Sequence, residues 1–238
     1  MGETSSYVLY FYLTNMLAEE LAAYIDHTQL RPEATAAQVA QLCDEARHYG
    51  FAAVCVAPCY VQLAKERLGP GSLVKVATVV GFPLGYQHAK VKLLETHQAI
   101  ADGANEIDVV MNISAFKSRK YEEVENELGD LAKFCHMHGA ALKVIIETAL
   151  LTPEEIAKAC ELCVAAEADY VKTSTGFAAR GASLEDIKLM RRALPAHMKI
   201  KASGGIKTTA DAEALIKAGA DRLGCSASVK IISHEQTS

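Results

Sequence analysis

The sequence predicts an α/β protein that folds as a single (β/α)8 TIM barrel, and three observations support this. From Met16 onward, stretches with helical apolar spacing alternate with short apolar segments, as parallel strands joined by helical crossovers require. The alternation occurs eight times, which is the number of units that closes such a barrel. The chain has 238 residues, half of them apolar, and this length suits one barrel domain.

Eight short stretches rich in β-branched and apolar residues are predicted as strands. In chain order they are Tyr24–Thr28, Ala52–Ala57, Lys75–Gly81, Glu106–Asn112, Ala141–Glu147, Tyr170–Thr175, Lys199–Ser203 and Arg222–Cys225. A doubly wound open sheet is the competing fold. The turns that follow the strands lack its G-x-G-x-x-G fingerprint, which favours the barrel.

The helices between these strands carry start and stop signals. Thr152 precedes Pro153, and Ser183 precedes Glu185, so both are predicted N-caps. Glycines are expected to end several helices, at Gly50, Gly103, Gly139 and Gly219. Similar helix-to-strand turns recur along the chain, at 103–106, 167–170 and 219–222.

Two regions are expected, a barrel domain over residues 16–238 and an N-terminal extension over residues 1–15. The extension contains an apolar, aromatic run at Tyr7–Leu13. This run is too short to span a bilayer, and no basic residue precedes it as in a signal peptide. The sequence leaves open whether it is a docked strand or helix, or a leader ahead of Met16.

Composition argues against several partners. The formal net charge is −5, and no cluster of Lys and Arg interrupts the mixed charge pattern, so nucleic acid is not an expected partner. A membrane is not expected either, because the apolar run at Tyr7–Leu13 is too short to span one. The seven cysteines are spread among apolar neighbours, which predicts reduced thiols in a cytoplasmic protein. Cys160 and Cys163 form a C-x-x-C inside a helical pattern, where a redox or metal role is not expected.

Five charged residues interrupt the predicted strands. They are Asp26, Asp108, Lys143, Lys172 and Lys201. A single such residue would be interpreted as a surface group or a helix-facing ion pair, but five together favour a site at the carboxyl ends of the strands. Because strand residues alternate sides, all five can face the barrel axis. Three lysines with two carboxylates leave one cation in excess, which suits an amine nucleophile and an anionic substrate.

The two lysine motifs carry the chemistry. Lys172 lies in the segment Tyr170–Phe177, and Lys201 occupies the matching place one strand-plus-helix repeat later. If both point into one low-dielectric interior, each ammonium disfavours the charge of the other. One amine then loses its proton near neutral pH and becomes a nucleophile.

A phosphate site is predicted after the last strands. The sixth strand is followed by Gly176, the seventh by Gly204 and Gly205, and the eighth runs through Gly224 to Ser226. Glycines let backbone N–H groups approach an anion, and barrels often bind phosphate at this rim. The alternative is that these glycines only form tight turns.

Metal chemistry is not expected. His136 and His138 lie at a predicted helix end, where histidines favour the negative end of the helix dipole. The other histidines show no pair at ligand spacing within strand ends. The sequence predicts an enzyme without metal or cofactor.

Six segments together resemble the 2-deoxyribose-5-phosphate aldolase family over most of the chain, from about Leu17 to Ile232. They are 24–30 (YIDHTQL), 54–58 (VCVAP), 81–85 (GFPLG), 106–112 (EIDVVMN), 171–177 (VKTSTGF) and 201–206 (KASGGI). The resemblance implies a Schiff-base, metal-independent lyase on a TIM barrel. The implied reaction is reversible cleavage of 2-deoxy-D-ribose 5-phosphate to acetaldehyde and D-glyceraldehyde 3-phosphate, in cytoplasmic deoxyribonucleoside catabolism.

The resemblance also implies residue roles. Lys172 matches the Schiff-base lysine, Lys201 the lysine that lowers its pKa, and Asp108 the aspartate that shuttles protons with Lys201. Asp26 and Lys143 match inward polar residues that assist substrate hydroxyls and the proton network. The phosphate cradle is matched by Gly176, Gly204, Gly205, Gly224 and Ser226.

The sequence departs from some relatives at two places. Ala227 stands where some carry a second serine. Some relatives end in a catalytic tyrosine tail, whereas the last tyrosine here is Tyr170. The expected partners are the sugar phosphate substrate and further copies of the chain, as a homodimer or a homotetramer.

The sequence is also compatible with two other functions. One is another phosphate-binding Schiff-base aldolase, of the transaldolase or fructose-bisphosphate type, which would not require acetaldehyde as its donor. The other is a sugar phosphate binding or regulatory protein that has kept the barrel and lost turnover. Release of acetaldehyde from substrate separates these functions from the first.

Overall fold

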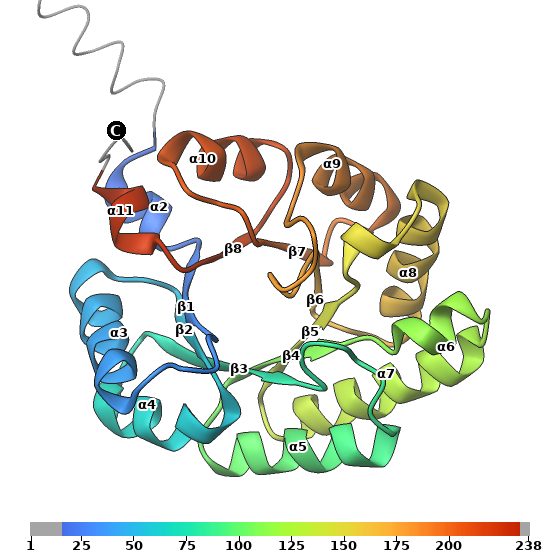
Figure 1. Ribbon diagram of the computed structural model, residues 1–238, viewed down its shortest axis with the longest axis horizontal. Helices are drawn as coiled ribbons and strands as arrows, with labels where there is room; N and C mark the ends of the chain where they lie inside the picture. Colours follow the sequence, from blue (N-terminus) through green and yellow to red (C-terminus); the bar gives the residue numbers. More distant parts are fainter. Residues whose placement is uncertain (1–15, 234–238) are drawn as a thin grey trace, which may run out of the picture.

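The computed structural model describes residues 16–233 and shows eight parallel strands closed into one barrel (Figure 1). Each strand pairs with its neighbours in sequence, and the eighth pairs with the first. The predicted fold class is therefore confirmed. The strands are β1 (Ile25–Gln29), β2 (Ala53–Val56), β3 (Lys75–Val80), β4 (Glu106–Val110), β5 (Ala141–Ile145), β6 (Tyr170–Lys172), β7 (Lys199–Ser203) and β8 (Arg222–Cys225).

Helices surround the barrel, and the first and last helices of the described residues, α2 and α11, lie side by side (Figure 1). The α-helices are α2 (Ala18–Ala22), α3 (Ala36–Tyr49), α4 (Val61–Leu68), α5 (Ala89–Ala101), α6 (Ile113–Lys117), α7 (Tyr121–Met137), α8 (Pro153–Ala165), α9 (Leu184–Ala193), α10 (Thr209–Lys217) and α11 (Ser228–Ile232). Two short 3₁₀ turns, η1 (Pro58–Tyr60) and η2 (Thr148–Leu150), follow β2 and β5.

The predicted strand positions are correct, with differences at the ends. Strands β7 and β8 have the predicted bounds, whereas β6 ends at Lys172 rather than at Thr175. The N–H of Thr173 still donates to the carbonyl of Lys201 on β7, but that of Thr175 donates to the side chain of Glu147 instead of to a strand. The prediction for the N-terminal extension falls on residues 1–15, outside the described residues.

The predicted helix caps are present. The hydroxyl of Thr152 accepts the N–H of Glu155 at the start of α8, and that of Ser183 accepts the N–H of Asp186 at the start of α9. Such caps satisfy N–H groups that have no partner within the helix. They fix where each helix leaves the strand-end rim that carries the site.

The apolar core has two parts. The larger part fills the layer between strands and helices, where the outward side chains of the barrel are buried. The smaller part lies on β2 and β3 and consists of Ala53, Cys55, Ala77 and Val79. Alternation along each strand assigns these residues to the barrel interior. The interior is therefore apolar on β2 and β3, and the other strands supply charged side chains.

None of the seven cysteines forms a disulfide, and Cys160 and Cys163 are buried within α8, as the helical pattern predicted. Burial raises the pKa of the Cys160 thiol to about 12. In the part of the chain that the structure describes, no helix has the length and apolar character needed to cross a membrane.

Candidate active site

The five charged strand residues found in the sequence converge inside the barrel. Their side chains are at most 3 % exposed, so they lie in the protein interior rather than on the helix-facing surface. Strand register explains the convergence, because Asp108 pairs with Lys143 across β4 and β5, and Lys172 pairs with Lys201 across β6 and β7.

Asp108 is the centre of this cluster. Its Oδ1 accepts from Lys143 at 2.7 Å, and its Oδ2 accepts from Lys172 at 2.8 Å and from Lys201 at 2.7 Å. Burial alone would raise the pKa of this carboxyl, but three neighbouring ammonium groups outweigh it and hold the pKa well below its ordinary value. Asp108 is therefore a carboxylate that joins three lysines.

Lys172 and Lys201 contact the same carboxylate oxygen and differ in their other neighbours. Burial lowers the pKa of Lys172, the charge of Lys201 lowers it further, and Asp108 opposes both effects incompletely. Lys201 is equally buried but contacts both Asp26 and Asp108, and these two carboxylates raise its pKa well above the ordinary value. The lysine without a second carboxylate is thus the one that gives up its proton more readily.

Sequence reasoning missed two members of the cluster, Glu106 and Arg222. The Glu106 carboxylate lies 2.6 Å from the Lys143 ammonium, and Arg222 donates to Asp26 at 2.6 Å. With Lys143 and Lys201 beside it as well, Asp26 keeps a pKa lowered to about 2, although burial acts in the opposite direction.

A signal for both missed residues was present in the sequence. Glu106 precedes Asp108 by two positions on one strand, and residues two apart share a face. Arg222 pairs in register with Lys201. Both are the first residue of a strand. At that position a charged residue is usually interpreted as the solvent-exposed end of the preceding turn, so the sequence pattern did not single them out.

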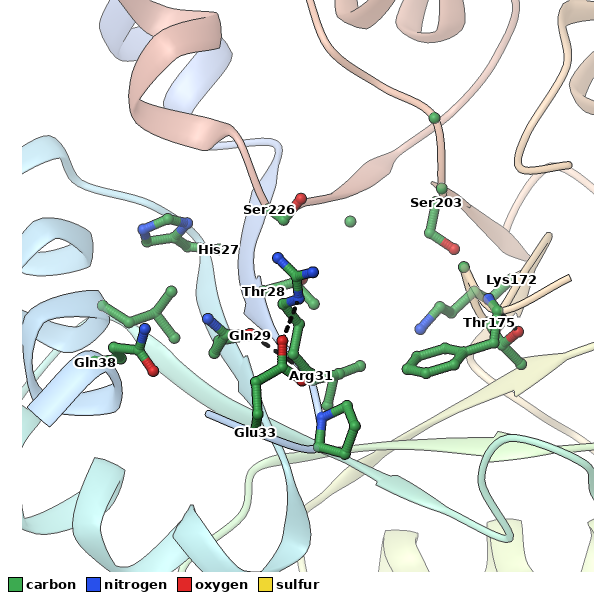
Figure 2. A pocket seen from close by; sticks show the side chains of 18 of the residues that line it. His27, Thr28, Gln29, Arg31, Glu33, Gln38, Lys172, Thr175, Ser203 and Ser226 are labelled. Atoms are coloured by element: carbon green, nitrogen blue, oxygen red, sulfur yellow. Dashed lines mark hydrogen bonds and ion pairs between the residues drawn. The ribbon is translucent and has the colours of Figure 1, made fainter. Parts of the chain in front are cut away.

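A cavity of about 820 Å³ opens above the cluster. Lys172 lines it, together with all five predicted phosphate-cradle residues, which are Gly176, Gly204, Gly205, Gly224 and Ser226. Figure 2 shows the amine of Lys172 pointing into this space, with Thr175 and Ser203 on the same side. The residues Asp26, Asp108, Lys143 and Lys201 do not line the cavity. Lys172 is therefore the member of the cluster that a bound molecule can reach.

Two consecutive glycines form one wall of the cavity. Gly204 and Gly205 have φ values of 80° and 79°, in the left-handed region that disfavours other residues. A Cβ on Gly181 would lie 2.0 Å from the carbonyl oxygen of Gly204, so the loops after β6 and β7 touch backbone to backbone. Within residues 16–233, the N–H groups of Gly204 and Gly205 donate to no protein acceptor. They are free to bind an anion.

Glu147 holds the loop that carries Gly176. Its Oε2 accepts from the N–H of Thr175 at 3.1 Å and from the Thr175 hydroxyl at 2.5 Å. The same hydroxyl oxygen accepts the N–H of Phe177 at 3.0 Å. Glu147 itself has a φ of 53°, an uncommon backbone conformation for a residue with a side chain. The structure thus fixes the turn on one side of the cavity through a buried carboxylate.

His27 connects the opposite side of the cavity to the helix layer. Its Nδ1 lies 2.9 Å from the hydroxyl of Ser228, and its Nε2 lies 2.7 Å from Glu45. Burial lowers the pKa of this imidazole, and Glu45 acts in the opposite direction. Figure 2 shows His27 across the cavity from Lys172. This histidine, to which no role was assigned from the sequence, links β1, α3 and the start of α11.

No group of three His, Cys, Asp or Glu side chains in the described ranges is arranged to hold a metal ion. His136 instead lies 2.9 Å from Asp169 and does not form a pair with His138.

A buried amine of lowered pKa, opening into a cavity at the carboxyl ends of eight parallel strands, defines an enzyme of the (β/α)8 barrel class. A family model described as DeoC/LacD family aldolase matches residues 21–234. The chain belongs to this aldolase family.

Curated relatives agree with this assignment. The chain is 51% identical to the deoxyribose-phosphate aldolase of Thermococcus kodakarensis over 91% of its own length and 97% of that protein. It is 53% identical to the deoxyribose-phosphate aldolase of Clostridium perfringens, with 90% of this chain and 94% of that protein covered. Near-complete coverage on both sides means that the similarity concerns the whole barrel.

Solved structures give the same result. A putative deoxyribose-phosphate aldolase from Coccidioides immitis aligns with a TM-score of 0.87 and 43% identity, over 92% of this chain and 87% of that one. The deoxyribose phosphate aldolase of Aeropyrum pernix, described as having a unique tetrameric structure, aligns with a TM-score of 0.84 and 36% identity, over 91% of each chain.

Proposed function

We propose that this protein catalyses reversible aldol cleavage of 2-deoxy-D-ribose 5-phosphate to D-glyceraldehyde 3-phosphate and acetaldehyde, through a Schiff base at Lys172. Family membership and the names of the relatives support the reaction. The observation that carries the mechanism is the environment of Lys172, a buried amine with a lowered pKa that lines the cavity.

The amine of Lys172 attacks the C1 aldehyde of the open-chain sugar and gives a carbinolamine. Loss of water then gives a protonated imine. The C3 hydroxyl gives up its proton, the C2–C3 bond breaks, and its electron pair moves into the imine to form an enamine. The C3 fragment leaves as D-glyceraldehyde 3-phosphate. Protonation of the enamine at C2 and hydrolysis of the imine release acetaldehyde and restore Lys172.

Asp108 and Lys201 lie on the side of Lys172 away from the cavity and assist its chemistry. Asp108 contacts both amines through one oxygen, which suits a group that relays protons during dehydration and enamine protonation. Lys201, held protonated by two carboxylates, keeps a positive charge beside Lys172. The resemblance implies that Asp26 and Lys143 assist substrate hydroxyls and the proton network. Their position beneath the cavity favours the second of these two roles.

The phosphate would bind at the wall formed by Gly204 and Gly205, with Gly176, Gly224 and Ser226 around it. Free backbone N–H groups and a hydroxyl are suitable donors to phosphate oxygens. The cavity volume lies in the range typical of small-molecule sites. A role in deoxyribonucleoside catabolism, a cytoplasmic location and assembly as a homodimer or homotetramer stay predictions. The tetrameric relative makes the oligomeric state worth measuring by light scattering.

Borohydride reduction in the presence of deoxyribose 5-phosphate is expected to attach a stable mass to Lys172. The imine forms only where an unprotonated amine meets the substrate, and peptide mass mapping identifies the position. Coupled detection of acetaldehyde, with and without a chelator, measures turnover and its dependence on metal ions in the same preparation.

Lys92 provides an internal control for this labelling. It is fully buried and burial lowers its pKa, but its ammonium lies between Glu127 and the Val110 carbonyl, away from the cavity. Its peptide should stay unmodified. Label on Lys201 or on no lysine would overturn the assignment, and saturable binding without acetaldehyde release would favour a binding protein.

Ser226→Ala is expected to raise KM for deoxyribose 5-phosphate about tenfold, because one hydrogen bond to a charged phosphate is lost. Activity with unphosphorylated deoxyribose should not change. Ser233→Ala, an exposed hydroxyl at the end of α11, is the matched control and should alter neither substrate. An equal effect of Ser226→Ala on both substrates would argue against phosphate binding here.

A further inference from the structure

The charged side chains inside the barrel form a closed ring. Asp26 contacts Lys201, Lys201 lies 2.7 Å from Asp108, and Asp108 lies 2.7 Å from Lys143. On the amino-terminal side of the barrel, Lys143 lies 2.6 Å from Glu106, and Glu106 lies 3.5 Å from Arg222. Arg222 closes the ring on Asp26 at 2.6 Å.

The ring alternates in sign and is electrically neutral. Its cations are Lys143, Lys201 and Arg222, and its anions are Asp26, Asp108 and Glu106. Lys172 lies outside the ring and contacts it only through Asp108, whose two oxygens already serve Lys143 and Lys201. A protonated Lys172 therefore adds a positive charge for which the ring has no unpaired anion.

We propose that Glu106 and Arg222 are positioning residues that complete a neutral ring of six charges, and that this neutrality makes Lys172 the surplus cation of the barrel interior. The proposal rests on the proposed function, because it explains how the Schiff-base lysine reaches its uncharged form. It adds two residues from the amino-terminal end of the barrel, the face opposite the cavity.

Apart from Lys172, no titratable side chain outside the ring forms an ion pair with a ring member within residues 16–233. Tyr170 lies 3.3 Å from Arg222, and the ammonium groups of Lys143 and Lys199 lie over its ring. Glu167, Asp169, Lys199 and His197 line the pocket outside Glu106 and Arg222. At the cavity end, burial raises the pKa of the Cys55 thiol, and Glu147 accepts from Thr175 rather than from a ring cation. His27 is occupied by Glu45 and Ser228.

Changing the net charge of the ring by one elementary charge should shift the pKa of Lys172. The direction of the shift depends on the sign of the added charge. In Glu106→Gln the ring gains a net positive charge, which disfavours the ammonium and lowers the pKa of Lys172. In Arg222→Gln it gains a net negative charge, which raises that pKa. Coulomb's law at an effective dielectric constant of about 20 gives a shift of about one pH unit for two charges separated by about 10 Å.

The experiment measures alkylation of Lys172 by formaldehyde and cyanoborohydride as a function of pH, with quantification of the Lys172 peptide by mass. Formaldehyde condenses with the neutral amine and loses water, and hydride from cyanoborohydride reduces the imine. The midpoint is expected to fall by about one unit in Glu106→Gln and to rise by about one unit in Arg222→Gln. The double variant, whose ring is again neutral, should return close to the parent.

Several controls separate charge from structure. The charge-retaining variants Glu106→Asp and Arg222→Lys should keep the parent midpoint. Exposed Lys188 on α9 should give the same profile in every protein. Midpoints that move in one direction in both single variants, or that do not move, would overturn the proposal.

The measurement does not depend on aldolase turnover. If deoxyribose 5-phosphate proves not to be the substrate, opposite shifts would still support the ring. If either single variant lacks the far-UV circular dichroism of the parent, the double variant decides. A parent-like midpoint together with a parent-like spectrum then supports the ring, and a displaced midpoint or an unfolded double variant counts against it.

Discussion

Lys172→Met is expected to abolish turnover and, at the same time, to raise the melting temperature. Loss of the nucleophile should reduce kcat by about four orders of magnitude or more. Methionine matches the length of the lysine stem and removes a buried amine that is costly to charge. Asp108 keeps Lys143 and Lys201 as partners. A gain of about 1 kcal/mol would raise Tm by about 2–4 °C in a domain of this size.

The sign of the stability change follows from proton linkage. The pKa of Lys172 is lower in the folded protein than in the unfolded chain. As pH falls below the unfolded value, near 10.4, the unfolded chain takes up a proton that the folded protein resists. The folded state is therefore penalised progressively until pH passes below the folded pKa. Calorimetry of Lys172→Met and the parent between pH 6 and pH 10 should show the difference shrinking as pH rises.

Lys172→Arg is the matched variant, because a guanidinium cannot lose its proton in this range. It should be as inactive as Lys172→Met but less stable than the parent. If both substitutions change Tm in the same direction, the surplus charge is not the cause.

Asp108→Asn is expected to produce the largest combined loss of stability and activity. The substitution removes the carboxylate shared by three buried lysines, and breaking a buried ion pair from one side typically costs about 3–5 kcal/mol. Loss of the proton relay should also lower kcat, by a factor of about 10²–10⁴. Urea unfolding at pH 7 and steady-state kinetics measure the two effects separately.

Asp44→Asn is the control for this substitution. Asp44 also pairs with a cation, Arg67, but both side chains are about half exposed on α3 and α4. Solvent screens such pairs, so the urea midpoint should fall much less than in Asp108→Asn. An Asp108→Asn protein as stable as this control would show that the shared carboxylate is not needed for folding.

The barrel could be predicted from the sequence because its periodic features are strong and local. Helix caps such as Thr152 and the repeated apolar segments each indicate one element, and eight similar units leave few ways to close a sheet. The end of β6 could not be placed, because Thr173 and Thr175 are both β-branched and favour a strand. The N–H of Thr175 instead makes a long-range bond to Glu147, which no local pattern indicates.

The candidate site was predictable where charge contradicted the strand environment. Lys143, Lys172 and Lys201 attract attention because each stands within an apolar segment. Glu106 and Arg222 begin their strands and look like ordinary turn residues, although they complete the buried network. His27 was missed for another reason, since its partner Ser228 is 201 residues away in the chain. No local pattern reports such a contact.

The division of the apolar core has a consequence for engineering this enzyme. The apolar cluster inside the barrel on β2 and β3 has only four residues, so hydrophobic stabilisation comes mainly from the much larger cluster between strands and helices. Directed evolution for heat or solvent tolerance can therefore work on the helix-facing shell without disturbing the lysine network. Libraries that target this outer layer should yield variants with higher heat or solvent tolerance and unaltered turnover far more often than libraries that target the barrel interior.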